Sequence, residues 1–279
     1  MPKLYFGPTG TPSSCRDRKP ESGVQCVRAL GLDAMELDFV YGVRLKPERA
    51  QAVRELAAQH KVKMSAHGAY YINLNAAEPQ KVARSKERIL KAARIAHLCG
   101  ASTVTFHAAF YLDEDPERVY ETVRAHLTEI VKVLRDEGNP IWVRPETTGK
   151  PAQFGTLDEI LKLGTQIEGV APCVDFAHLH ARSGGGCNTY EAFDEVLLRV
   201  ERAMGRPALG QMHIHVAGVE YTPQGERKHL KLGESDFRYR ELLRALKDRQ
   251  VGGLVICESP DPQDDALLLK KTYSDLNGG

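Results

Sequence analysis

Short apolar runs of four to six residues recur along the chain, and each is followed by a longer, mixed segment. The runs have the composition of β-strands and occupy residues 4–7, 34–39, 62–66, 103–107, 141–146, 171–175, 211–215 and 254–258. Helical periodicity is clearest over residues 46–59, 80–98, 115–136, 157–164, 190–203 and 236–248. Eight strand-then-helix units predict an α/β fold, a (β/α)8 TIM barrel and not a doubly wound sheet.

Residues that favour helix ends support these boundaries. Pro47 and Pro116 lie in predicted first turns, where the missing amide hydrogen of proline costs little, and Pro116 follows Asp115. Gly100 stands where the segment 80–98 should stop.

Composition favours one globular unit. The chain has 279 residues, 27% charged and 42% hydrophobic, and no Pro/Gly/Ser-rich linker divides it. We therefore expect a single barrel domain over residues 1–279. Lys and Arg (38) nearly balance Asp and Glu (37), so the net charge of +1 gives no general argument for a polyanionic partner. Any surface for nucleic acid must be a local patch.

Cysteine usage and the amino terminus bear on localisation. The six cysteines include no Cys-x-x-Cys pair, and several lie in apolar segments, where free cysteine behaves as a small hydrophobic residue. A reducing, cytoplasmic compartment is the resulting expectation. The first residues have no apolar signal core, and no stretch approaches the roughly 18 apolar residues of a membrane span, so no membrane association is expected.

Metal-ligand residues end most of the predicted strands. His67, His107, Glu146, Asp175 and Glu258 each close an apolar run, and the run 211–215 contains His213 and His215. The carboxyl ends of barrel strands meet at one rim, where catalytic groups lie. Imidazoles and carboxylates gathered there form a ligand set for divalent metals. Alternation along the strands turns His107 and His213 inward and their apolar neighbours toward the helices.

We therefore predict metal binding by His67, His107, Glu146, Asp175, His213 and Glu258, and by His178, three residues beyond Asp175. Other candidates are set apart. His60, His97 and His126 lie on or beside predicted helices and are expected to be structural or solvated, whereas His180, in a predicted loop, stays undecided. For Cys173, packing is favoured over ligation.

Seven motifs, in order, resemble the endonuclease IV family of apurinic/apyrimidinic endonucleases. They are Ser65-Ala66-His67-Gly68-Ala69-Tyr70-Tyr71-Ile72-Asn73-Leu74, Phe106-His107, Pro145-Glu146-Thr147-Thr148-Gly149, Cys173-Val174-Asp175-Phe176-Ala177-His178, Met212-His213-Ile214, His229-Leu230-Lys231-Leu232-Gly233-Glu234 and Cys257-Glu258-Ser259-Pro260. The resemblance extends over about four-fifths of the chain.

The resemblance implies a barrel with three zinc ions that acts as a monomer on DNA in base excision repair. One ion would be held by His67, His107 and Glu146, a second by Glu146, Asp175, His213 and Glu258, and a third by His178 and His229. The reaction it implies is hydrolysis of the phosphodiester bond 5′ to an abasic site. Glu146, bridging two metals, and Glu258, orienting the nucleophile, would be catalytic, and Tyr70 would enter the DNA.

Three segments depart from the family pattern. Arg227 stands where the family has the aspartate that completes the third zinc site, although Glu226 is adjacent. The residues His215 and Val216 replace an Asn-Asp pair after the strand-seven histidine. The loop after the second strand lacks the family's lesion-recognition sequence, so Tyr41 or Arg44 would serve there, with Arg227 and Lys228 as further DNA contacts.

A sugar isomerase or epimerase is the main alternative. Glu146, Asp175, His213 and Glu258 also resemble the single Mn²⁺ or Mg²⁺ site of such enzymes, and the acidic Glu36 and Asp38 suit a neutral sugar. A single-metal site does not need the additional histidines. A barrel that has lost catalysis and only binds a partner is the third interpretation. Ligands of this kind accept Zn²⁺, Mn²⁺ and Fe²⁺, so the metal stays open, with zinc expected from the resemblance.

Overall fold

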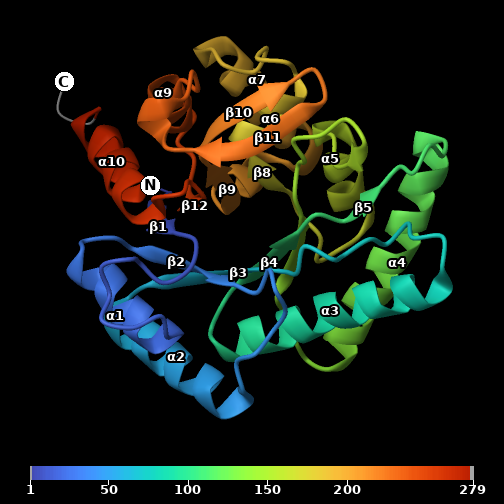
Figure 1. The fold of residues 1–279 in the computed structure, drawn as a ribbon, viewed down its shortest axis with the longest axis horizontal. Coiled ribbons are helices and arrows are strands. Elements are labelled where there is room, and N and C mark those ends of the chain that lie inside the picture. Colours follow the sequence, from blue (N-terminus) through green and yellow to red (C-terminus); the bar gives the residue numbers. More distant parts are fainter. Residues whose placement is uncertain (1, 277–279) are drawn as a thin grey trace.

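Eight parallel strands form a barrel in the computed structural model, which describes residues 2–276 (Figure 1). The barrel strands are β1 (Leu4–Pro8), β2 (Ala34–Asp38), β3 (Lys63–His67), β4 (Thr103–Phe106), β6 (Trp142–Pro145), β8 (Cys173–Asp175), β9 (Met212–Val216) and β12 (Gly253–Cys257). Each lies within two residues of its predicted run. The predicted (β/α)8 fold is confirmed.

Two four-stranded sheets make up the barrel wall. One has the order β2-β3-β4-β6 and the other β1-β12-β9-β8. Parallel bridges between Thr9 and Glu36 and between Glu146 and Cys173 join the two sheets at both seams. Closure leaves no unpaired sheet edge that would invite association with another chain.

Helices surround the strands. They are α1 (Pro20–Ala29), α2 (Pro47–His60), α3 (Pro79–Leu98), α4 (Pro116–Asp136), α5 (Leu157–Gln166), α7 (Tyr190–Met204), α9 (Tyr239–Asp248) and α10 (Pro262–Asp275). Five of them begin with proline, whose fixed φ suits the first turn. Across residues 2–276, every helix falls short of the length and apolarity that crossing a membrane requires.

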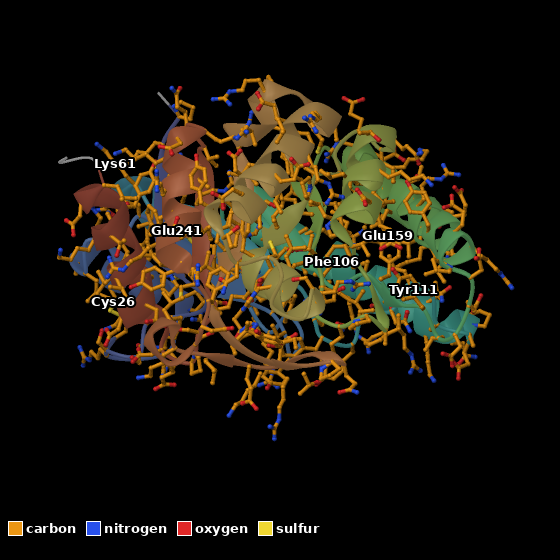
Figure 2. The ribbon with its side chains drawn as sticks, turned by 90° about the horizontal axis from the view of Figure 1, so that it is seen from above. Cys26, Lys61, Phe106, Tyr111, Glu159 and Glu241 are labelled. Carbon is orange, nitrogen blue, oxygen red and sulfur yellow. A yellow bond between two sulfur atoms is a disulfide. The ribbon has the colours of Figure 1, made fainter. Side chains whose placement is uncertain are left out.

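Strand alternation separates an apolar layer from a polar barrel interior. Val104, Phe106 and Ile214 pack in the core between strands and helices, and Figure 2 shows Phe106 inside the molecule. The residues that alternate with these along each strand, such as Thr105 on β4 and His213 on β9, are buried on the opposite face of the barrel wall. The predicted inward direction of His213 is therefore confirmed.

Short elements on the carboxyl-terminal rim were not predicted. They are β5 (Ala109–Phe110) paired with β7 (Gln153–Phe154), the helix α6 (Phe176–Arg182), the antiparallel hairpin of β10 (Gly218–Thr222) and β11 (Gly225–Leu230), and the 3₁₀ turn η1 (Leu232–Glu234). A further short helix, α8 (Arg206–Leu209), directly precedes β9 at the opposite end of the barrel. Near β5, the Tyr111 hydroxyl donates to both oxygens of Glu159 at 2.8 and 2.9 Å, a pair labelled in Figure 2.

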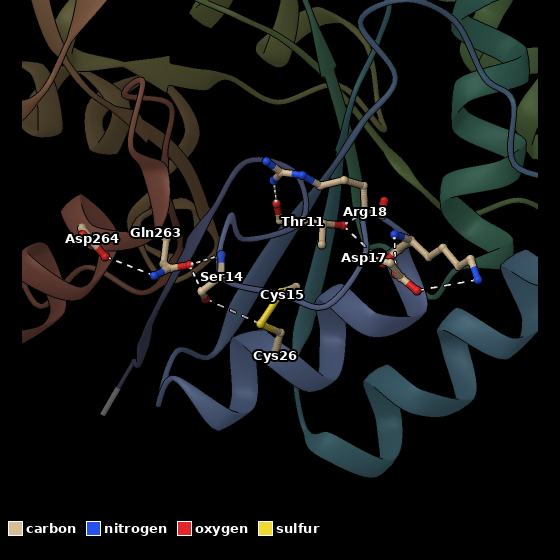
Figure 3. Close-up of a disulfide and its surroundings, with 9 residues drawn as sticks. Thr11, Ser14, Cys15, Asp17, Arg18, Cys26, Gln263 and Asp264 are labelled. Carbon is tan, nitrogen blue, oxygen red and sulfur yellow. Dashed lines mark hydrogen bonds and ion pairs between the residues drawn. A yellow bond between two sulfur atoms is a disulfide. The ribbon is translucent and has the colours of Figure 1, made fainter.

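A disulfide joins Cys15, in the loop after β1, to Cys26 on α1 (Figure 3). The expectation that the cysteines are reduced is wrong for this pair, because the loop brings the two Cα atoms to 5.9 Å. Cys99, Cys173, Cys187 and Cys257 are free, as expected. The Ser14 hydroxyl also donates to Gln263 Oε1 at 2.6 Å, so the loop is tied to both α1 and α10.

Candidate metal centre

The carboxyl-terminal rim gathers histidines and carboxylates from both sheets. His67 ends β3 and Asp175 ends β8, while Glu146 and Glu258 directly follow β6 and β12. The helix α6 and the hairpin strand β11 add further members. The gathered side chains are His67, His107, Glu146, Asp175, His178, His215, Glu226, His229 and Glu258.

Glu146 lies at the middle of this group and is fully buried. Its Oε2 is 3.1 Å from His67 Nε2 and 3.3 Å from His107 Nε2. Its Oε1 is 3.2 Å from Nδ1 of His178 and 3.2 Å from Nδ1 of His215. Each carboxylate oxygen thus faces a different pair of imidazole rings.

Three of the histidines are oriented by main-chain carbonyls. Nδ1 of His67 donates to Gly68 O at 2.8 Å, and Nδ1 of His178 donates to Thr147 O at 2.9 Å. Nδ1 of His229 donates to the carbonyl of Glu258 at 2.9 Å. Each bond fixes the tautomer and leaves an Nε2 lone pair directed at the neighbouring ligands. Histidines that bind metals are commonly held in this way.

Asp175 supplies the clearest sign that a cation belongs here. Its Oδ1 accepts the amide hydrogen of His178 at 2.7 Å and so caps α6. Its Oδ2 is buried with no hydrogen-bond partner, and burial raises the pKa of this carboxyl group. A buried oxygen without a partner is costly, and a bound divalent cation would satisfy it. The donor set therefore fits a metal.

The electrostatics of the cluster point the same way. Burial opposes ionisation of Glu258, but the charge of His215 outweighs it and lowers the pKa of Glu258 to about 2. Burial likewise disfavours the charged form of His67, yet the adjacent Glu146 carboxylate raises the pKa of His67 to about 9. The buried carboxylates thus require positive charge nearby, which either protonated imidazoles or metal ions can supply.

Four sets of side chains have potential ligand atoms within 4.8 Å of one another; one, Cys173 with His213 and His215, lies in the barrel interior, and the other three lie at the rim. The sets at the rim are His67, His107 and Glu146; Glu146, Asp175, His215 and Glu258; and Asp175, His178 and His229. Two of the sets share Glu146, and two share Asp175. This sharing describes a connected, polynuclear centre and not three separate sites.

On strand seven the arrangement differs from the predicted one by one layer of side chains. His213 does not join Glu146, Asp175 and Glu258; His215 lies there instead, with Nδ1 3.4 Å from Glu258 Oε2. Residues two apart share a face of a strand, so both imidazoles point inward, but His213 lies deeper in the barrel.

Glu36 holds the deeper layer together. Its Oε2 accepts the Ser65 hydroxyl at 2.7 Å and lies 3.0 Å from Nε2 of His213. Its Oε1 lies 3.1 Å from Nε2 of His215, the ring nitrogen opposite the one that faces Glu146. Glu36 is buried beneath the metal-ligand group, so it orients His215 and does not face a sugar substrate. Asp38 is exposed at the end of β2.

A β-bulge brings Glu226 to the centre. In the hairpin, Glu220 pairs with Lys228 while Tyr221 pairs with Glu226, so Arg227 is an extra residue in β11. The extra residue puts Glu226 on the same face as His229, three positions later. Glu226 Oε1 lies 3.6 Å from His229 Nε2, and its Oε2 lies 3.4 Å from His178 Nε2.

The predicted DNA contacts lie around the rim. Tyr70 is 58% exposed and Tyr41 is 70% exposed, and their ring centroids are 6.0 Å apart in an edge-to-face pair. Arg44 is exposed in the loop after β2. Arg227 and Lys228 are exposed, but both pair with Glu220, at 2.6 and 3.2 Å. The hairpin therefore offers less free positive charge than its sequence suggests.

The remaining candidates have structural roles or lie elsewhere. His180 lies on α6 and not in a loop, and its Nε2 is 3.0 Å from Asp236 Oδ1. Cys173 is buried near His213 and His215, and burial raises the pKa of its thiol to about 12, in keeping with packing. The three histidines predicted to lie on or beside helices do so: His60 lies on α2, His97 on α3 and His126 on α4.

A family model described as a xylose isomerase-like TIM barrel matches residues 24–273. The chain belongs to the xylose isomerase-like TIM barrel family. It is 44% identical over 273 residues to an uncharacterized protein of Methanocaldococcus jannaschii, covering 98% of both chains. It is 27% identical over 250 residues to a probable endonuclease 4 of Halorhodospira halophila, covering 85% of this chain and 81% of that protein.

A solved structure of a D-tagatose 3-epimerase-like protein has a TM-score of 0.75 and 19% identity, covering 98% of this chain and 97% of that one. At this identity the likeness concerns the fold alone. Membership of the xylose isomerase-like family therefore does not decide between a nuclease and an isomerase activity.

Two candidate ligands, His215 and Glu226, were not among the predicted metal-binding residues. The rule that ligands end their strands favours His215 over His213, and applying it there would have found the right residue. Glu226 was noted in the sequence as the acidic neighbour of Arg227, but its approach to the centre depends on a bulge that the sequence pattern did not predict.

The two histidines of β9 should differ in their effect on metal content. We expect His215→Ala to lose at least one tightly bound metal equivalent, because His215 faces Glu146 and Glu258. His213→Ala should retain the wild-type equivalents, with affinity reduced by about tenfold as for other outer-shell residues. Elemental analysis after dialysis, alongside thermal melting to confirm folding, measures both. Equal loss of metal in the two variants would contradict this assignment.

Proposed function

We propose that the protein is a metal-dependent phosphodiesterase that hydrolyses DNA on the 5′ side of abasic sites, using two or three zinc ions, with manganese as the alternative. The connected ligand sets carry the proposal: Glu146 and Asp175 are each shared, and histidines surround them on several sides. A single-metal sugar site needs four ligands and leaves His67, His107, His178 and His229 without a role.

Metal ions in such a centre lower the pKa of water toward neutrality and stabilise charge on a phosphodiester during in-line displacement. Glu146 would bridge two of the ions through its separate oxygens. Glu258 has a lowered pKa and lies at the edge of the group, where, as a carboxylate, it would ligate metal and accept a hydrogen bond that orients the attacking water. Asp175 would bind through the oxygen that lacks a hydrogen-bond partner.

Glu226 would complete the third ligand set. Its two oxygens face His178 and His229, while Arg227 turns outward to Glu220. In this chain a bulge and a glutamate would thus replace the aspartate two residues before the histidine. With Glu226 in this role, the presence of Arg227 at the position of the family's aspartate would not prevent binding of a third metal ion.

Exposed aromatic rings support nucleic acid as the substrate. Tyr70 lies next to the centre, with its ring centroid 6.2 Å from that of His67, and Tyr41 packs against it. Paired tyrosines at this position would fill the gap in a duplex left by a missing base or stack on its neighbours. Arg44 would contact the backbone from the same side. The sequence relationship to a probable endonuclease 4 agrees with this substrate class.

Sugar isomerisation is the second candidate because the set of Glu146, Asp175, His215 and Glu258 would also hold one metal ion. It would require two carboxylates to move protons beside a neutral ketose. Glu36, which favoured this alternative from the sequence, is buried below His215, where its oxygens face Ser65, His213 and His215 and not the rim.

The decisive experiment combines elemental analysis of tag-free protein with cleavage of a duplex oligonucleotide containing one abasic site. We expect two or three zinc equivalents and a nick that leaves a 3′-hydroxyl and a 5′-deoxyribose phosphate. The undamaged duplex and chelator-treated protein are the controls. One manganese or magnesium equivalent, intact DNA and epimerisation of a ketohexose would replace the proposal with the sugar alternative. A protein that retains no metal would support a binding role only.

Neighbouring residues of β11 provide a matched test of the third ligand set. Glu226→Gln keeps the side-chain shape but removes the charge, so it should lose one metal equivalent and slow cleavage by about 100-fold. Arg227→Ala should keep the full metal content, because Arg227 points away from the centre. Elemental analysis and single-turnover cleavage measure both effects. Unchanged metal content in Glu226→Gln would exclude Glu226 as a ligand.

Loss of the exposed aromatic ring should weaken DNA binding and leave the metals in place. Tyr70→Ala removes one stacking contact, which corresponds to a decrease in affinity of roughly 10-fold for abasic duplex. Tyr70→Phe should retain most of the affinity, since the ring and not the hydroxyl makes the contact. Fluorescence anisotropy of labelled duplex in chelated protein measures binding without cleavage. Equal affinities of Tyr70→Ala and wild type would remove Tyr70 from the DNA-binding surface.

A further inference from the structure

A second cavity lies at the opposite end of the barrel from the metal centre. It has a volume of about 990 Å³ and is lined by residues at the amino ends of the strands, among them Lys3, Lys63, Thr103 and Trp142. Figure 2 shows Lys61, another lining residue, on the side of the molecule away from the β10–β11 hairpin. The proposed phosphodiesterase activity makes no use of this cavity.

The charge of the cavity wall is strongly positive. Lys3, Lys61 and Lys63 line it, and across residues 2–276 none of the three has a carboxylate partner within ion-pair distance. The one acidic residue of the wall, Asp33, is already paired with Arg28 and Lys270. Unpaired lysines around a concave surface attract and retain anions.

Buried polar groups at the wall lack partners. Arg144 donates through its terminal nitrogens to the carbonyls of Pro172 and Gln211, both at 2.8 Å, and its Nε has no acceptor. The Thr103 hydroxyl and Nδ1 of His213 are also buried without partners. Burial lowers the pKa of Arg144 to about 10, which reflects a buried cation without a counter-ion. The wall beneath the lysines is therefore polar and carries the uncompensated positive charge of Arg144.

Aromatic rings accompany the positive charge. Tyr5 lies between Lys3 and Lys63, whose Nζ atoms are 5.0 and 5.5 Å from its ring centroid. Trp142 lines the same cavity and is 37% exposed, with the Arg144 guanidinium 5.8 Å from its ring centroid. A partly exposed indole beside a guanidinium is a stacking surface for a planar ring.

We propose that this cavity binds a nucleoside phosphate, with the phosphate held by Lys61, Lys63 and Arg144 and the base stacked on Trp142. Its volume is within the range of small-molecule sites, and it combines few, convergent polar groups with aromatic surface. The residues assigned to the phosphate and the base are not candidate metal ligands, so this proposal can be tested separately from the proposed nuclease activity.

Trp142 is the only tryptophan of the chain and therefore reports directly on the cavity. Titration of the full-length protein with AMP should quench its fluorescence saturably, and calorimetry should give the same Kd. Adenosine and inorganic phosphate should each bind about tenfold more weakly or worse than AMP. Equal binding of adenosine would overturn the phosphate contact, and equal binding of phosphate would overturn the stacked base.

A charge-matched pair of variants tests the assigned lysines. The double variant Lys61→Glu with Lys63→Glu should weaken AMP binding by at least about tenfold, because both cations are replaced by repulsive charge. The control, Lys132→Glu with Lys271→Glu, makes the same charge change on exposed helix positions and should bind AMP as wild type does. Equal affinity of the two double variants, or no saturable quenching in wild type, would overturn the proposal. Metal content should be unchanged in both.

Discussion

The burial of the Glu146 carboxylate is the constraint on which the carboxyl-terminal rim depends. A carboxylate removed from water without compensation costs several kcal/mol, and here the compensation comes from imidazoles on β3, α6, β9 and the end of β4. The backbone of the same residue bridges to Cys173 and joins the two sheets. Barrel closure and assembly of the ligand group are therefore one event, because both require β6 and β8 to meet in this register.

The barrel and most of its metal-ligand residues could be predicted because they follow from two periodicities. Strands ending at His67 and Asp175 alternate with amphipathic helices, and the carboxyl ends of parallel strands converge wherever the barrel closes. The choice between His213 and His215 follows from neither periodicity, because both residues face inward. It depends on how far β9 rises before it crosses the rim, which is set by strand tilt and pairing with β12.

Loop geometry accounts for what the sequence could not provide. The pairing of Cys15 with Cys26 depends on the path of the loop after β1, which Gln263 on α10 helps to hold. The polar interior below the metal centre was also hidden, since Glu36 becomes intelligible only beside Ser65, His213 and His215. Such contacts join side chains from different strands, and the local sequence does not indicate which side chains will meet inside the barrel.

The bulge at Arg227 also has an evolutionary meaning. A bulge differs from a regular strand by one residue, so a single codon deletion or insertion creates or removes it. In a hairpin without the extra residue, the side chain two positions before the histidine faces the centre. In the bulged hairpin, the side chain three positions before His229, that of Glu226, faces it instead. Lineages can therefore exchange one carboxylate position for the other in two short mutational steps. Motif searches that demand a fixed spacing between the acidic residue and His229 will misjudge chains that have taken these steps.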